Sequence, residues 1–106
     1  MKRGGIYWYS FQAPDKRRPV LILTRDSAIP VLNSVTVAPI TSTIRDIPTE
    51  VPLTQEDGVP TPCAANFDNI QTVPKQKLAG RITRLSRARL DEVDQAVAFA
   101  LGMGAG

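Results

Sequence analysis

The sequence predicts a mainly β domain that ends in one helix. Three observations predict it: short runs rich in β-branched and aromatic residues, nine prolines among 106 residues, and apolar helical spacing near the C-terminal end only. Roughly five or six short strands followed by a helix indicate a small, strongly bent antiparallel sheet or a partly open barrel. The length is near the common size for one hydrophobic core, so we expect a single domain over residues 1–106.

The first half of the chain contains three predicted strands. Residues 5–11 form an aromatic-rich strand, and residues 12–17 form a turn with a basic tip. Residues 19–24 are a continuous apolar run, which is typical of a strand covered on both faces. Pro19 stands at the first position of that run, where its missing N–H is tolerated. The third strand is predicted over residues 34–40.

The second half of the predicted sheet consists of shorter segments. Residues 47–54 alternate between apolar and polar side chains, and Pro48 and Pro52 mark them as an edge strand. Two further strands, residues 61–68 and 69–73, follow around a bend. Between and after these strands we expect turns at residues 55–60 and 75–78.

The most regular segment is a predicted helix over residues 87–101, with Ser86 as its N-cap. Apolar residues repeat there at helical spacing and form one stripe: Leu90, Val93, Val97, Ala100 and Leu101. This stripe indicates that the helix closes the core. Residues 102–106 are rich in glycine, and we expect them to form a flexible tail.

The residue types themselves exclude several kinds of chemistry. The chain has no His and one Cys, Cys63, so it can form neither a thiolate zinc cluster nor an intrachain disulfide. It has no glycine-rich phosphate loop and its carboxylates are scattered, so we expect no metal and no cofactor. We interpret Cys63 and Trp8 as core residues rather than as reactive or binding groups.

The expected location is the cytoplasm. No apolar stretch approaches the length of a membrane span, so we expect no membrane association. Met1-Lys2-Arg3 leads straight into the first predicted strand rather than into a signal peptide. A lone Cys favours a reducing compartment.

The net charge of +3 is unevenly distributed. Residues 1–25 and 75–89 are strongly basic, and Asp15 is the one acidic residue within these two stretches. If both stretches face the same side, they form a surface that binds polyanions. The alternative is that the lysines and arginines only keep a small sheet soluble.

Two strand-like segments carry the polar groups that are best suited to binding or catalysis. Arg17 and Arg18 lead into one apolar segment, while Thr41 and Ser42 follow the other. If these strands are antiparallel neighbours, the start of one lies beside the end of the other. A guanidinium and a hydroxyl would then share one rim of the sheet, where they could hold a phosphate.

The order of motifs along nearly the whole chain resembles the MazF/PemK family of toxin endoribonucleases. The motifs that carry this resemblance are Lys2-Arg3-Gly4, Arg18-Pro19-Val20-Leu21-Ile22, Pro39-Ile40-Thr41-Ser42, Asn69-Ile70-Gln71-Thr72-Val73, Lys77-Leu78 and Leu90-Asp91-Glu92-Val93-Asp94. The resemblance implies an SH3-like barrel, a homodimer and metal-independent cleavage of single-stranded RNA. It also implies a cognate antitoxin that neutralises the toxin by occupying the RNA groove.

The resemblance also suggests roles for individual residues. The family's active-site arginine falls on Arg18, and its partner hydroxyl falls on Thr41. An RNA-contacting position falls on Asn69, and Gln71 is placed to hydrogen-bond base edges. Further RNA contacts are expected from Lys16, Arg17 and Ser42. Tyr7, Tyr9 or Phe67 could provide a surface on which bases stack, and the alternative is that these aromatic residues belong to the core.

The implied reaction needs no nucleophile from the protein, because the substrate's own 2′-OH attacks the adjacent phosphate. The products are a 2′,3′-cyclic phosphate and a free 5′-OH. Two alternatives stay open from the sequence. One is a non-enzymatic toxin of the CcdB-like gyrase-poison type, and the other is a barrel that binds nucleic acid or peptide without cleaving it.

Overall fold

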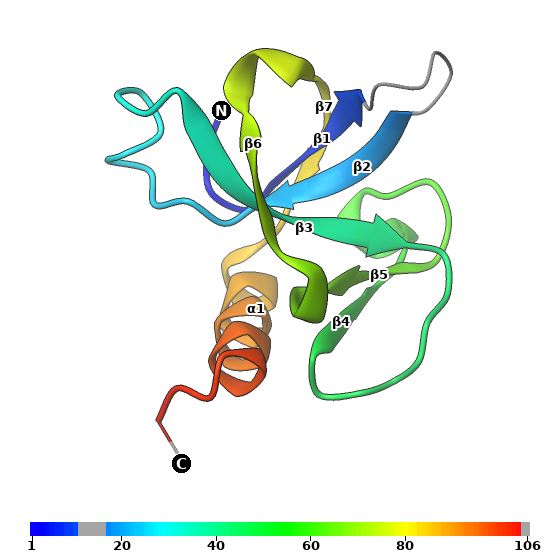
Figure 1. Ribbon diagram of the computed structural model, residues 1–106. Coiled ribbons are helices and arrows are strands. Elements are labelled where there is room, and N and C mark those ends of the chain that lie inside the picture. Colours follow the sequence, from blue (N-terminus) through cyan, green and yellow to red (C-terminus); the bar gives the residue numbers. More distant parts are fainter. Residues whose placement is uncertain (11–16, 105–106) are drawn as a thin grey trace.

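The computed structural model describes residues 1–10 and 17–104. The described residues form seven strands: β1 (Gly5–Ser10), β2 (Arg17–Ile22), β3 (Ser34–Thr41), β4 (Glu50–Leu53), β5 (Cys63–Asn66), β6 (Gln71–Pro74) and β7 (Leu78–Arg84). They are followed by a helix, α1 (Arg87–Ala100), and Figure 1 shows this helix lying to one side of the bent sheet. Short 3-10 turns occur at Gln55–Asp57, Phe67–Asn69 and Lys75–Lys77.

The sheet is antiparallel, with strand order β4-β5-β3-β2-β1-β7. β3 is the central element because it changes partners along its length. Its first half pairs with β6, and its end pairs with β5, so the sheet bends at β3 (Figure 1). The prediction of a mainly β fold with a strongly bent antiparallel sheet and a C-terminal helix is therefore confirmed.

β7 is a strand that the sequence did not predict as one. It pairs with β1, and that pairing contains register shifts on either side of Tyr7. Gly80 within it has φ +69°, the left-handed backbone region. A glycine inside a strand and an irregular register are typical of a β-bulge, which weakens the alternation that sequence patterns depend on.

Side chains pack on both faces of the sheet. The core between the sheet and α1 includes Ile6, Leu21, Leu53, Phe67 and Val93. The opposite face has a second cluster, which includes Val20, Ile22, Val35, Val37 and Val73. Consecutive residues of β2 are thus buried on opposite sides, as the continuous apolar run predicted. Pro19 is the third residue of β2 rather than the first.

The helix begins as the sequence predicted and ends one residue earlier. Ser86 is its N-cap, and the Ser86 hydroxyl oxygen accepts a hydrogen bond of 3.2 Å from the Arg89 N–H. Val93 and Ala96 are buried against the sheet. Among the described residues, none of the helices is long and apolar enough to cross a membrane.

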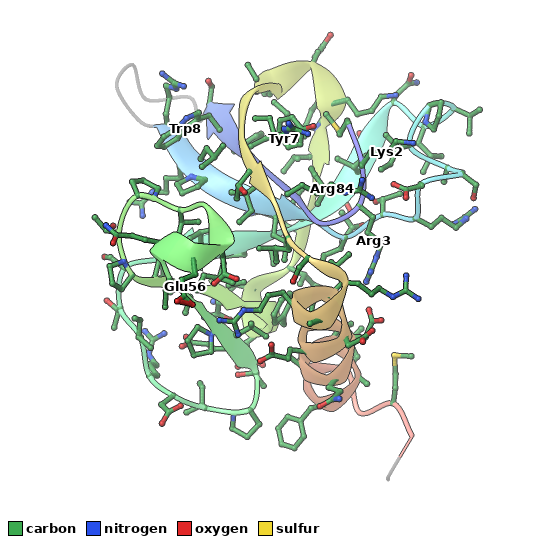
Figure 2. The ribbon with its side chains drawn as sticks, turned by 180° about the vertical axis from the view of Figure 1, so that it is seen from behind. Lys2, Arg3, Tyr7, Trp8, Glu56 and Arg84 are labelled. Atoms are coloured by element: carbon green, nitrogen blue, oxygen red, sulfur yellow. The ribbon has the colours of Figure 1, made fainter. Side chains whose placement is uncertain are left out.

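The N-terminal segment is fastened to both the sheet and the helix. Arg3 donates from Nε to the Leu23 carbonyl at 2.9 Å and from Nη2 to the Asp94 carboxylate at 2.8 Å. Figure 2 shows Arg3 where the start of the chain meets the top of α1. Gly4, at φ +88°, lies under Leu90, and a Cβ there would be 2.8 Å from a Leu90 methyl group. The left-handed backbone conformation at this position favours glycine.

Candidate functional site: a cavity between strand ends

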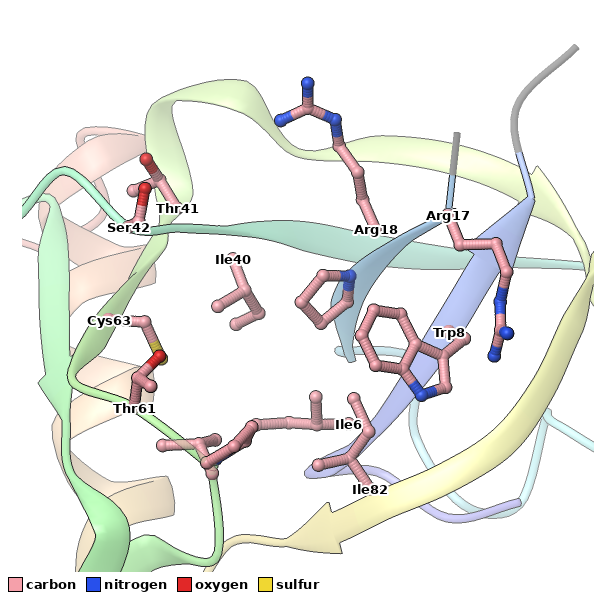
Figure 3. Close-up of a pocket in the computed structure, with 13 residues that line it drawn as sticks. Ile6, Trp8, Arg17, Arg18, Ile40, Thr41, Ser42, Thr61, Cys63 and Ile82 are labelled. Atoms are coloured by element: carbon pink, nitrogen blue, oxygen red, sulfur yellow. The ribbon is translucent and has the colours of Figure 1, made fainter. Parts of the chain in front are cut away.

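A cavity of about 460 Å³ opens where the ends of β2 and β3 meet the segment that precedes β5. This volume lies within the range of ligand-binding pockets. Its wall is mainly apolar, and Figure 3 shows polar side chains at its rim. The apolar wall includes Ile6, Trp8, Pro19, Ile40, Val59, Pro60, Cys63 and Ile82, and the polar rim includes Arg17, Arg18, Thr41, Ser42 and Thr61.

Arg18 and Thr41 both border this cavity because β2 and β3 are antiparallel neighbours. The strands pair through Val20↔Pro39, and two residues further along stand Arg18 on one strand and Thr41 on the other. In Figure 3 the Arg18 guanidinium and the Thr41 hydroxyl lie on the same side of β3. Arg18 is exposed, and its side chain has no hydrogen bond or ion pair with any described residue. Its guanidinium is therefore available to an anion.

Thr41 is held in a fixed orientation at the exit of β3. It is half-buried, and its hydroxyl oxygen accepts a hydrogen bond of 3.1 Å from the Thr43 N–H. This contact closes a small turn of the kind that Ser and Thr form with their own backbone. Because the oxygen accepts from the backbone, the hydroxyl hydrogen remains free to donate to a ligand.

Trp8 lines the cavity instead of filling the core, so its interpretation as a core residue was wrong. It is half-buried, and the Arg17 guanidinium lies over its ring at 4.9 Å from the ring centroid. Trp8 follows Ile6 at a spacing of two along β1, so both point to the cavity side. Phe67 is 1% exposed and belongs to the core, so it cannot stack a base.

Cys63 also lines the cavity, on the side opposite Trp8 in Figure 3. It is buried, as the sequence predicted, and makes part of the apolar wall. Burial raises the pKa of the Cys63 thiol above its ordinary value, and the negative charge of Asp57 raises it further. The protonated thiol is a poor nucleophile at neutral pH.

The described residues contain no group of three or more His, Cys, Asp or Glu side chains that could hold a metal ion. The described part of the cavity wall has no carboxylate. Its donors are guanidinium and hydroxyl groups, which recognise anionic oxygens. The arrangement therefore suits a phosphate group better than a cation.

Comparison with known proteins places the chain in a family. The family of PemK-like, MazF-like toxins of type II toxin-antitoxin systems matches residues 2–101. The chain belongs to this family. The probable endoribonuclease MazF2 of Mycobacterium tuberculosis is 43% identical to it over 103 residues, which are 96% of this chain and 99% of that protein.

Solved MazF-family structures share the fold as well as the sequence. The Mycobacterium tuberculosis toxin MazF-mt6 superposes with a TM-score of 0.86 at 38% identity, covering 95% of this chain and 99% of that one. An endoribonuclease in complex with its cognate antitoxin, from Mycobacterial species, superposes with a TM-score of 0.88 at 26% identity, covering 100% of this chain and 99% of that one. The predicted family and the predicted enzyme class, a toxin endoribonuclease, are thereby confirmed.

The structure brings some of the predicted MazF-family site residues together and leaves others apart. Four line the cavity: Arg17, Arg18, Thr41 and Ser42. Asn69 ends the 3-10 turn before β6, and Gln71 begins β6; both are exposed and outside the cavity wall. Gln71 pairs with Val37, which places it on the same face of β3 as Thr41. Lys16 lies outside the described residues.

Proposed function

We propose that this MazF-family toxin cleaves single-stranded RNA at short sequences without a metal ion, and that Arg18 and Thr41 carry the reaction. The observation that supports this is that an exposed guanidinium and an oriented hydroxyl lie on the same side of β3, at the rim of one apolar cavity (Figure 3). Both groups come from strand ends, which hold them on a rigid support. RNA must be single-stranded for its bases to leave the stack and enter such a cavity.

The reaction proceeds by attack of the substrate's 2′-oxygen on the adjacent phosphorus. The 2′-O–P bond forms, the P–O5′ bond breaks, and the leaving 5′-oxygen takes up a proton as the 2′-OH loses one to solvent. Arg18 donates two hydrogen bonds to the non-bridging oxygens, on which negative charge develops. Thr41 donates one more. A guanidinium keeps its proton at neutral pH, so Arg18 acts by electrostatic stabilisation and positioning rather than as the base.

The rest of the RNA is held by contacts that extend beyond the cavity. Arg17 and Ser42 border the cavity and bind flanking phosphates. Asn69 and Gln71 reach bases further along the strand, because they lie beyond the cavity wall on the β6 side of β3. Lys16, which lies outside the described residues, is proposed as a further phosphate contact. We further propose that the toxin acts in the cytoplasm as a homodimer and is neutralised by a cognate antitoxin.

The test is cleavage of a long single-stranded RNA in the presence of EDTA, with the fragment ends identified chemically. We expect discrete cuts at a recurring short sequence, with 2′,3′-cyclic phosphate and 5′-OH ends, and cleavage by Arg18→Ala that is slower by roughly 10²-fold or more. Arg25→Ala is the matched control, since Arg25 is an exposed arginine outside the cavity wall. Intact RNA after incubation with folded wild-type protein, or cuts that require a divalent metal, would contradict the proposal.

A further inference from the structure

The cavity has one wall that the proposed reaction does not use. The connection between β4 and β5, residues 54–62, is called the wall loop here. It supplies Val59, Pro60 and Thr61 to the cavity. Figure 3 shows Thr61 across the cavity from Trp8, on the far side from the Arg17 stack. A substrate group that enters the cavity therefore lies between Trp8 and the wall loop.

Thr61 is the one residue of this wall with a hydrogen-bonding side chain. It is exposed, and its hydroxyl makes no hydrogen bond to any described residue. Its neighbours in the wall, Val59, Pro60 and Cys63, are apolar or weakly polar. A single free hydroxyl in an apolar wall fixes the orientation of a flat polar ligand such as a nucleobase, because the base edge has no competing partner there.

The wall loop is fixed at its first turn by its own residues. Thr54 caps the turn at Gln55–Asp57: its N–H donates to Asp57 Oδ2 at 2.9 Å. Gln55 Nε2 donates to the Pro60 carbonyl at 3.0 Å, which ties the start of the loop to the residue before Thr61. Through these contacts, the position of the turn determines the position of the cavity wall.

The same turn is clamped from outside by β7 and α1. The Thr83 hydroxyl donates to the Asp57 carbonyl at 2.9 Å. Gly58 follows at φ +95°, and a Cβ there would collide with the Thr83 hydroxyl, so this position requires glycine. Arg89 of α1 donates to Asp57 Oδ1 from Nε at 2.9 Å and to Oδ2 from Nη2 at 3.2 Å. This two-point contact is called the Arg89–Asp57 latch below.

We propose that Thr61 is a specificity-determining residue that reads one base beside the scissile phosphate, and that Arg89 and Asp57 are positioning residues that set its place. The inference rests on the proposed function and deepens it, since it assigns base selection to the wall loop. Arg89 never contacts the RNA in this scheme. It acts through the orientation of the turn at Gln55–Asp57.

The test compares cleavage rates on short single-stranded RNAs that differ by one nucleotide next to the mapped cut. The measured quantity is the ratio of kcat/KM for the preferred RNA to kcat/KM for each changed RNA. Partial loss of active enzyme lowers both rates equally and leaves the ratio unchanged. A shift in the ratio therefore cannot come from a smaller fraction of active enzyme.

Three variants and two matched controls are needed. Thr61→Val keeps the shape and removes the hydroxyl, and Thr72→Val is its control on the exposed surface of β6. Arg89→Met keeps the unbranched stem and removes the latch. Arg87→Met is its control, since Arg87 lies on the same helix with 91% of its side chain exposed. Arg89→Lys retains the charge without the two-point contact.

We expect Thr61→Val to lower the ratio about five- to tenfold at one nucleotide position, the effect of losing one hydrogen bond. Arg89→Met lowers the ratio at that same position by a smaller factor, and Arg89→Lys falls between Arg89→Met and the wild type. The single-turnover rate at saturating preferred RNA stays near that of the wild type. Both controls keep the wild-type ratio.

An unchanged ratio in folded Thr61→Val overturns the assignment of base reading to Thr61. A lowered ratio in Thr61→Val with an unchanged ratio in both Arg89 variants overturns the positioning role. If Arg89→Met does not fold, Arg89→Lys still tests the positioning role and Thr61→Val still tests base reading. Cuts at the wild-type rate in folded Arg18→Ala overturn the proposed function itself, whereas Arg18-dependent cuts with unchanged ratios overturn only this inference.

Discussion

Two arginines serve the same cavity in opposite ways. Arg18 stands exposed at the rim and pairs with none of the described residues. The Arg89 side chain is 27% exposed and makes four hydrogen bonds, two to Asp57 and two to Glu92. A guanidinium whose donors are mostly engaged by the protein contributes to stability, while one whose donors are free can bind an anion. The difference in partners, rather than the residue type, distinguishes the two roles.

The largest expected effect separates activity from stability at Arg18. Arg18→Ala is expected to lower the cleavage rate by roughly 10²-fold or more, because it removes donors aimed at the developing phosphate charge. The midpoint of thermal unfolding is expected to stay at the wild-type value, since Arg18 has no intramolecular partner among the described residues. Rates are measured on a single mapped site, and unfolding is followed by circular dichroism.

Arg18→Lys sharpens that prediction. It keeps the positive charge but loses the planar fork, so part of the rate is expected to return. A rate for Arg18→Lys as low as that for Arg18→Ala would show that the geometry of the two donors matters more than the charge. A wild-type rate in folded Arg18→Ala would remove Arg18 from the mechanism.

The reverse pattern is expected at Arg89. Arg89→Met leaves the Asp57 carboxylate, which is 9% exposed, with the Thr54 N–H as its one remaining donor among the described residues. An under-paired buried carboxylate is expected to lower the free energy of unfolding by about 1–3 kcal/mol. Chemical denaturation measures this change. Arg87→Met, whose ion pair with Asp91 is long and exposed, is expected to change it by less than about 0.5 kcal/mol.

Equal destabilisation by the two arginine variants would show that the latch contributes no more than a surface charge. In that case the contact of Arg89 with Asp57 would not distinguish Arg89 from Arg18 in its contribution to the free energy of unfolding. Only the difference in access to the cavity would remain.

The sequence predicted the features that depend on neighbouring residues. Ser86 was identifiable as an N-cap because its hydroxyl acts within one turn of the helix. The burial of Val20, Leu21 and Ile22 followed from an uninterrupted apolar run. Antiparallel pairing of two segments was sufficient to predict that Arg18 and Thr41 share one rim, although their catalytic roles stay predictions.

The features that sequence patterns missed depend on contacts between distant parts of the chain. Trp8 was interpreted as core because an aromatic residue in a strand is usually buried, and only the arrangement around β1 opens a cavity beside it. Glu50 is buried although it is charged, because the Arg45 side chain and N–H both donate to its carboxylate. In our proposal the position of Thr61 depends on the Arg89–Asp57 latch, whose two residues are 32 positions apart in the chain. No local periodicity indicates such a contact.

The smallest expected effect is the dependence of the latch on pH. Burial alone would raise the pKa of Asp57, but hydrogen bonds from Arg89 and the Thr54 N–H, with the charge of Arg89, outweigh it and hold the pKa below its ordinary value of 3.8. Because the folded protein binds this proton less tightly than the unfolded chain, the latch stabilises the fold fully above the ordinary value. The stabilisation is lost as the pH falls through the lowered value.

Asp57→Asn is therefore expected to be less stable than the wild type at neutral pH, by an amount that shrinks as the pH falls below about 4. The measurement is the free energy of unfolding by urea for both proteins from neutral pH into the acid range. The ratio of cleavage rates that depends on Thr61 is expected to change only in the pH range where Asp57 becomes protonated, because the position of Thr61 depends on the latch. A stability difference that stays constant through the acid range would mean that Asp57 contributes through shape and hydrogen bonding alone. The charge of Asp57 would then not contribute to holding the wall loop in place. The contrast between the paired Arg89 and the unpaired Arg18 would not explain the position of the loop.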